Sequence, residues 1–482
     1  MTGHPLALLA LSFILVSTSS AEAQGVHSLS LDEAIRAAIG HGDDIALAKA
    51  GVRAAESGET VARSGMLPQV AASAVYTRTL HSQYSGLASS TSTKDTSSGA
   101  GSIMSLFKNL PFGKENQWTI GLTASETIFA GGRISAQQDA AESRTRSAMI
   151  DLTAAEAQVA LNVTQSYYDA VLADTLVKIS SDALKQAGEV SRQMDLAFKV
   201  GERAEFDALR AKVARDNQIP QLLQSENDRE AAYSRLKQLL NIPLDDSIFL
   251  TTQVDDSLSR FAMNSDPSPA ARSSVRQASE AVAMTDAQLR IAESMRWPMI
   301  SVSSTYSPVA YPDNVIPNNN DWLSNWTASL SVSLPLYTGG NISGSVDAAR
   351  AAAEQASTRL SLTRKSAELD SRLSSLALAA ASANLRSAAG TASEASRAYE
   401  IAQVRFSQGI STQVELDDAR LQEQQARANW ARSVRNYQVA RAKLALLKDL
   451  PLAGGQAAPM PATSSPTMGG VQSPSSGAPT GQ

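Results

Sequence analysis

The chain carries one pattern twice: residues 118–143 read WTIGLTASETIFAGGRISAQQDAAES, and residues 326–351 read WTASLSVSLPLYTGGNISGSVDAARA. The two stretches align without a gap at a spacing of 208 residues, which also relates Phe198 to Phe406 and Leu239 to Leu447. One spacing held over more than a hundred residues indicates an internal duplication.

Upstream of these stretches the spacing changes. Residues 67–70 (LPQV) align with residues 297–300 (WPMI), and Tyr76 aligns with Tyr306, at a spacing of 230. The change from 230 to 208 places a longer connection before Trp118 than before Trp326. Only a loop tolerates such a difference, so each unit is expected to contain two strands joined by a loop of variable length.

Hydrophobic alternation predicts the strands. In the second unit an apolar row alternates with a hydroxyl row, which is the period of a strand with two different faces: Leu330, Val332, Leu334 and Leu336 against Thr327, Ser329, Ser331 and Ser333. In the first unit Glu126 interrupts the apolar row. We predict strands over about 67–80, 118–130, 298–308 and 326–337, close to the roughly 9–11 residues of a membrane-spanning strand.

Long helices are predicted after each Gly-Gly pair. No Gly or Pro occurs between Gly132 and Gly188 or between Gly344 and Gly390, and good helix formers fill the intervals. We expect helices over about 133–198 and 342–406, each roughly 95 Å long. Turns then reverse the chain into further helices over 204–219 and 412–450.

Composition excludes several functional classes. The 482 residues include no Cys and only four His, and 42 Lys and Arg against 47 Asp and Glu give a net charge of −5. There are therefore no disulfides, no thiolate metal sites and no lipid anchor on Cys, and no basic excess suited to nucleic acid. With neither a metal cluster nor a phosphate loop in the sequence, we expect no cofactor and no enzyme activity.

The two units lie between terminal segments of different character. An apolar run ending in the A-x-A pattern of residues 21–23 predicts a cleavable signal peptide over 1–23. The first repeat then covers 24–260, the second covers 261–450, and a Pro/Ser/Gly-rich tail expected to be disordered covers 451–482. No stretch is long and apolar enough to predict a membrane-spanning helix, so a membrane segment would have to consist of strands.

Four amphipathic strands predict an oligomer. Open sheet edges are not tolerated in hydrocarbon, and membrane barrels close from about eight strands upward. Two, three or four copies would supply eight, twelve or sixteen strands around a polar lumen, with the long helices continuing the tube. The alternative is a non-pore coiled-coil scaffold or adhesin, which explains the helices but not the two-faced strands.

The duplicated unit resembles the TolC-like outer membrane efflux proteins. The resemblance covers residues 29 to 450 and rests on the Leu-Pro-Gln entry at 67–69, the strand-to-helix junctions FAGGR (129–133) and YTGGN (337–341), and the F-x-x-G turns at Phe198 and Phe406. It implies a mainly α fold that forms, as a homotrimer, a 12-stranded transmembrane β-barrel and a long periplasmic α-helical barrel. It also implies an exit duct in the outer membrane of a Gram-negative-type envelope, in contact with outer membrane lipid. Such ducts serve tripartite efflux or type I secretion through a periplasmic adaptor (membrane fusion) protein and an inner-membrane pump or ABC transporter. The resemblance does not specify which cargo is carried.

The resemblance also assigns candidate sites. It implies a periplasmic gate of two acidic rings, six and nine residues after Gly409, at Glu415 and Asp418, whereas Asp417 is expected to face outward. Adaptor docking is expected at the two tip turns, and the Gly-Gly pairs form the strand-to-helix junctions. The turn residues are Val200, Gly201, Glu202, Arg203, Gln408, Gly409, Ile410 and Ser411, and the junction glycines are Gly131, Gly132, Gly339 and Gly340. Relatives often carry an arginine where this chain has Ser411. The resemblance therefore does not specify which contacts hold the gate closed in this chain.

Overall fold

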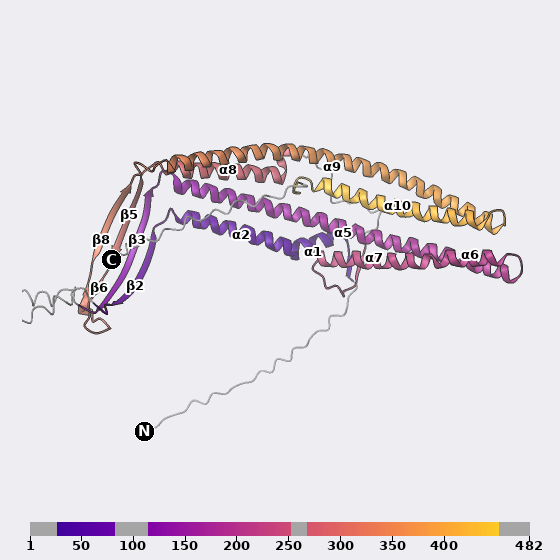
Figure 1. Cartoon of the computed structure of the whole chain (residues 1–482), viewed down its shortest axis with the longest axis horizontal. Helices are drawn as coiled ribbons and strands as arrows, with labels where there is room; N and C mark the ends of the chain where they lie inside the picture. The colour runs from indigo at the N-terminus through magenta and orange to yellow at the C-terminus, as the bar shows by residue number, and fades with distance from the viewer. Residues whose placement is uncertain (1–26, 82–113, 252–267, 453–482) are drawn as a thin grey trace, which may run out of the picture.

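The computed structural model describes residues 27–81, 114–251 and 268–452. The predicted signal peptide, most of the first interstrand loop and nearly all of the predicted tail lie outside the described residues. The molecule is elongated, with an antiparallel sheet at one end and paired helical tips at the other (Figure 1).

Two long helices set the length of the molecule. They are α5 (Arg133–Lys199) and α9 (Asn341–Ser407), of 67 residues each, which corresponds to about 100 Å. Both begin directly after a Gly-Gly pair and end at a tip turn. Together with the sheet they confirm the predicted fold class, a mainly helical chain built from a duplicated helix, strand, strand, long helix, helix unit.

The sheet joins the two repeats. Its long strands are β2 (Gln69–Arg78), β3 (Asn116–Phe129), β5 (Met299–Tyr306) and β8 (Trp326–Ser333), and β6 (Val309–Ala310) and β7 (Trp322–Leu323) extend it at the loop end, beside the short 3-10 helix η3 (Asn319–Asp321). The long strands pair antiparallel in the order β2-β3-β5-β8, so β3 and β5 form the junction between repeats. Strand β8 ends at Ser333, four residues before the predicted end, since Pro335 has no N–H to continue the ladder toward β5.

Shorter helices line the long ones. Near the sheet, α2 (Asp43–Ser64) packs on α5, and α8 (Ser273–Ser294) lies against both α5 and α9. Toward the tips, α6 (Glu205–Asp216) and α7 (Gln218–Leu239) pack on α5, and α10 (Gln413–Ala445) packs on α9.

A proline explains one difference between these helical hairpins. Helix α10 is continuous, whereas the matching segment of the first repeat is divided into α6 and α7 around Asn217. Pro220 stands here at the position of Ala428 in α10. Because proline donates no hydrogen bond to the preceding turn, it divides the helix.

The main core lies midway along the molecule. There, α1 (Leu31–His41) and the parallel strands β1 (His27–Leu29) and β4 (Ile248–Leu250) pack against α5 and α7. The fully buried Tyr167 donates its hydroxyl to the Leu29 carbonyl at 2.9 Å. Many of the other buried residues are Ala, Val and Leu, which allow close helix packing and explain why few aromatic residues suffice.

Candidate functional site

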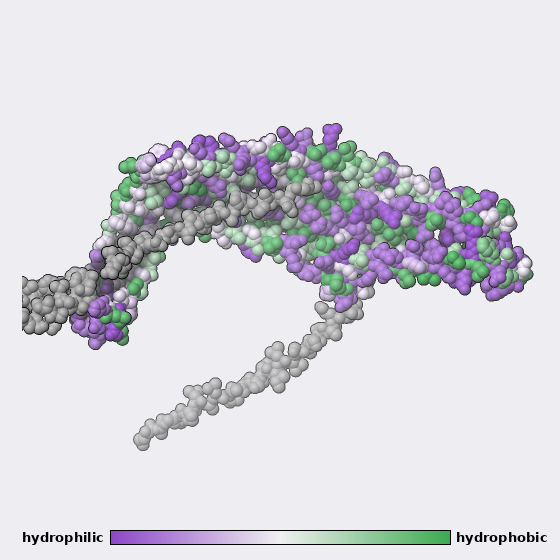
Figure 2. All heavy atoms as spheres, in the orientation of Figure 1, coloured by the Kyte–Doolittle hydropathy of each residue, from purple (hydrophilic) through white to green (hydrophobic). Residues whose placement is uncertain are grey.

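The sheet has two chemically different faces. Strand register brings the apolar residues of all four long strands to one side, where they are exposed: Val70 at 67%, Leu330 at 68% and Val332 at 61%. The other members of this apolar face are Ala72, Ala74, Tyr76, Trp118, Ile120, Leu122, Ala124, Ile300, Val302, Tyr306, Trp326 and Ala328. Figure 2 shows pale and green surface along the outer edge of the sheet and mostly purple surface over the helices. A contiguous apolar face of this kind marks a surface that is covered by another molecule or by lipid.

The opposite face is formed mainly by hydroxyl groups. The Thr123 and Thr305 hydroxyls lie 3.3 Å apart across β3 and β5, and the Ser303 and Ser329 hydroxyls lie 2.8 Å apart across β5 and β8. Such a face suits contact with water. Glu126 is the one charged residue on the apolar face of β3, near the helical end, where it lies opposite Val302.

Aromatic residues lie on the apolar face at the end away from the helices. The Tyr76 and Trp118 rings are 5.0 Å apart, and Tyr306 pairs with Trp326. Two of these residues have a satisfied polar atom: the Trp326 indole N–H donates to Ser304 at 2.8 Å, and the Tyr76 hydroxyl donates to the Asn116 side chain at 2.8 Å. Aromatic rings with an apolar body and a polar tip are typical of a membrane–water boundary.

The predicted junction glycines occupy the turns between strand and helix. Gly132 and Gly340 are the N-caps of α5 and α9, and all four glycines have positive φ, from 60° to 88°. Gly131 also approaches its neighbour closely: a Cβ there would lie 2.6 Å from the Trp297 Cβ, whereas Gly339 faces open space. No sequence pattern pointed to this contact with Trp297.

The predicted docking residues form the two helical tips. Gly201 and Gly409 have φ of 81° and 70° and let the chain reverse. Val200 and Ile410 are each 63% exposed, and Glu202, Arg203 and Gln408 are also exposed. Ser411 differs, because it is buried at 8% exposure. It therefore presents little surface to a partner.

The two predicted gate carboxylates lie on the first turns of α10. Thr412 caps this helix by accepting from the Glu415 N–H at 3.3 Å. The Glu415 side chain is exposed, and Asp418 is exposed and accepts from Gln422 at 2.8 Å. Neither forms an ion pair within the described ranges, and both carboxylates face solvent.

Asp417 was expected to face outward, but its side chain is half-buried and forms an ion pair. Its carboxylate lies 3.2 Å from the guanidinium of Arg420, which is itself buried. Burial raises the pKa of Asp417, and Arg420 and Arg210 oppose that rise only in part. Asp417 therefore belongs to the packing between α10 and its neighbours rather than to a free acidic surface.

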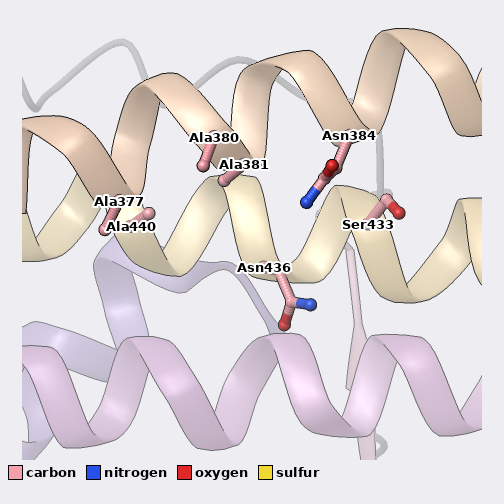
Figure 3. Close-up of a pocket in the computed structure, with 7 residues that line it drawn as sticks. All are labelled: Ala377, Ala380, Ala381, Asn384, Ser433, Asn436 and Ala440. Atoms are coloured by element: carbon pink, nitrogen blue, oxygen red, sulfur yellow. The ribbon is translucent and has the colours of Figure 1, made fainter.

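The helical wall offers a shallow groove between α9 and α10 (Figure 3), of about 310 Å³. It is lined by Ala377, Ala380, Ala381, Asn384, Ser433, Asn436 and Ala440. None of these residues is charged, and four of the seven are alanines, so the groove reflects close packing of small residues rather than a chemical centre.

None of the helices in the described ranges combines the length and apolarity that crossing a membrane requires. No three His, Asp or Glu side chains in the same ranges gather where they could hold a metal ion.

The sequence profile described as "Outer membrane efflux protein" matches residues 34–241 and 268–448, which is most of the chain. The chain belongs to this family. No curated protein matches it by sequence.

Several solved structures share its fold. The Campylobacter jejuni CmeC outer membrane channel superimposes with a TM-score of 0.72 at 19% identity, covering 88% of this chain and 87% of that chain. The open state of the Neisseria gonorrhoeae MtrE outer membrane channel gives 0.71 at 16% identity, covering 94% and 98%. The Vibrio cholerae outer membrane protein VceC gives 0.68 at 17% identity, covering 87% and 96%.

Proposed function

We propose that this member of the outer membrane efflux protein family is an exit duct, a channel that passively conducts substrates out of the periplasm. The observation that carries the proposal is the two-faced sheet. An exposed apolar face suits lipid and a hydroxyl face suits a water-filled lumen. The alternative, a scaffold or adhesin without a pore, gives no reason for this separation of faces.

The proposal requires several copies of the chain. Four long strands cannot close a barrel, and backbone groups at open edges cannot stay unpaired in hydrocarbon. Closed membrane barrels begin at about eight strands, and the family resemblance favours a homotrimer with twelve. The same trimer would surround a helical tunnel that reaches into the periplasm.

The helical tips supply the other half of the proposal. We propose that they dock a periplasmic adaptor, which connects the duct to an inner-membrane pump or ABC transporter of a tripartite efflux or type I secretion system. Glu415 and Asp418 would then form two rings of three carboxylates each at the narrow end. The export signal at 1–23 and the outer membrane location belong to the same proposal.

Two neighbouring residues of β8 test the sidedness that the proposal needs. Leu330→Lys places a charge on the apolar face, at a cost of about 2–4 kcal/mol near the middle of a bilayer, and should prevent insertion. Ser331→Lys, the matched control, adds the same charge to the hydroxyl face. It should still insert and should shift the channel toward anion selectivity, as charged rings do in pores.

The measurement is conductance of the purified protein in planar bilayers, with the reversal potential read in a salt gradient. A scaffold would stay soluble without detergent and would give no conductance. Equal behaviour of the two lysine variants would contradict the assignment of the faces.

A further inference from the structure

The loop between β5 and β8, residues 307–325, folds back onto the sheet at the end away from the helices. Two short strands of this loop extend the sheet beside β3, since β6 pairs with β3 and β7 pairs with β6. Figure 1 labels β6 at this end of the sheet. Residues directly opposite each other in an antiparallel pair share one face, so the register shows on which side each part of the loop lies.

Strands β6 and β7 continue both faces of the sheet. Ala310 lies opposite Trp118 on β3 and opposite Trp322 on β7, so Trp322 belongs to the apolar face. Leu323 lies in the row of Thr119 and therefore belongs to the hydroxyl face. The loop thus presents side chains to both sides.

The segment that follows β6 crosses the apolar face. We call residues 311–316 the outer strap. The Trp118 indole N–H donates to the Val315 carbonyl at 2.7 Å. The Asn116 side chain donates to the carbonyls of Pro312 and Asp313 at 3.5 and 3.4 Å. Both donors are even-numbered residues of β3, whose side chains point to the apolar side, so the backbone of the strap lies on that side.

The outer strap covers one tryptophan and exposes apolar surface of its own. Trp118 is half-buried, whereas the equivalent Trp326 is 77% exposed. The strap presents Val315 at 50% and Ile316 at 77% exposure. Its exposed apolar side chains therefore lie beside the aromatic residues of the apolar face and extend that face.

The charges around the outer strap cancel in pairs. Lys114 forms an ion pair with Asp313, and the Arg78 Nη2 lies 3.5 Å from the Glu115 Oε2. A partner recognised by its charge requires an excess of the opposite sign on the surface that binds it. Paired charges next to exposed Val and Ile side chains instead suit hydrocarbon chains, because burial of apolar surface needs no charge.

We propose that the outer strap is a lipid-contacting element, in which Val315 and Ile316 lie against the acyl chains of the bilayer at the outer end of the duct and the strap stays out of the lumen. The inference rests on the proposed function in one respect, because it takes the apolar face of the sheet to be the lipid face. The bilayer is the partner because the strap continues that face.

Single cysteines that carry an environment-sensitive dye test the side on which the strap lies, in a chain that has no cysteine of its own. Ile316→Cys reports on the strap. Leu323→Cys is the matched control, since Leu323 is an exposed apolar residue of the same loop on the opposite face. Leu330→Cys marks the apolar face itself. Each labelled full-length chain is reconstituted in phospholipid vesicles, and its emission is quenched either by a nitroxide-labelled phospholipid or by iodide in the water.

The nitroxide lipid should quench the dye at Ile316 and at Leu330 and should spare the dye at Leu323, and iodide should do the reverse. Lipid quenching at Leu330 without lipid quenching at Ile316 would overturn the strap proposal and leave the proposed function intact. Absence of lipid quenching at Leu330 would instead reject the assignment of the faces and with it the proposed function. Loss of current in planar bilayers when Ile316→Cys is labelled would place the strap in the lumen and also overturn the proposal.

A second test releases the strap. Trp118→Phe keeps an aromatic ring but removes the N–H that binds the Val315 carbonyl. The matched control is Trp326→Phe, which removes the N–H that binds Ser304 instead. With the dye at Ile316, Trp118→Phe should weaken quenching by the nitroxide lipid and strengthen quenching by iodide, and Trp326→Phe should change neither. Equal quenching in the two variants would contradict the role of the Trp118 indole in holding the strap on the apolar face.

Discussion

Arg272 and Asp370 form an ion pair in the interior of the helical body. The Arg272 Nη2 lies 2.8 Å from the Asp370 Oδ2, and the arginine side chain is fully buried. Arg272 also lies 3.5 Å from the Leu450 carbonyl. The pair therefore links the start of α8, the middle of α9 and the segment that follows α10.

Removing Arg272 should destabilise the chain. Arg272→Met leaves Asp370 without its partner in a mostly buried site, and breaking a buried pair in this way costs about 3–5 kcal/mol. Arg350→Met is the matched control, since Arg350 and Asp347 form an exposed pair at 3.4 Å, and exposed pairs contribute about 0–1 kcal/mol. Unfolding in denaturant measures the free energy of unfolding that each variant loses relative to wild type. Similar losses for the two variants would show that the buried pair contributes no more to stability than a surface pair.

The contact between Gly131 and Trp297 predicts unequal effects within one turn. Gly132→Ala introduces a side chain at positive φ, at about 1–2 kcal/mol, and meets nothing closer than the Ser135 hydroxyl at 3.9 Å. Gly131→Ala carries the same backbone cost and also collides with Trp297, which adds about 1–3 kcal/mol of overpacking. The melting temperature by circular dichroism should fall further for Gly131→Ala, and the reverse order would exclude the clash.

Asp417 should make the helical tip more stable in mild acid. Burial raises the pKa of Asp417 in the folded chain, so between the ordinary aspartate pKa of about 3.9 and that raised value the folded chain binds more protons than the unfolded chain. The free energy of unfolding then rises as the pH falls through this window.

The pH effect is measured as the difference in melting temperature between variant and wild type from pH 4 to pH 7. Asp417→Asn should lose the acid stabilisation. Asp418→Asn removes the neighbouring but exposed carboxylate and serves as the control. Parallel pH profiles for wild type and Asp417→Asn would contradict the assignment.

Periodicity and the Gly-Gly signals predicted the strands and helices, because period two, helical composition and positive-φ glycines are local properties. Long-range partners were not predictable in this way. Asp370 lies 98 residues from Arg272, and neither residue belongs to a pattern. Asp417 was judged from helix spacing alone, whereas its environment depends on Arg210 of the other hairpin. The division of the first hairpin does have a sequence signal, Pro220, which also limits the helix predicted over 204–219.

The exposed tip residues predict where an adaptor would be captured. Cysteines at Val200 or Gln408, carrying a thiol-reactive cross-linker in cells, should give adducts with a periplasmic protein, because both side chains are exposed at the turns. Ser411→Cys is the control at the same tip, since that position is buried. Equal adducts from all three positions, or none from the exposed two, would count against docking at the tips.

The acidic pair on α10 predicts the electrical behaviour of the narrow end. If three copies bring Glu415 and Asp418 together, their six carboxylates attract cations and offer oxygen ligands to divalent ions. Glu415→Ala with Asp418→Ala should raise single-channel conductance and weaken block by divalent cations. Asp347→Ala is the control, because it removes an exposed carboxylate at the opposite end of α9. Single-channel recording with and without magnesium separates the cases: a response of the Asp347 variant equal to that of the double variant would mean that overall charge, and not a gate at Glu415 and Asp418, controls the current.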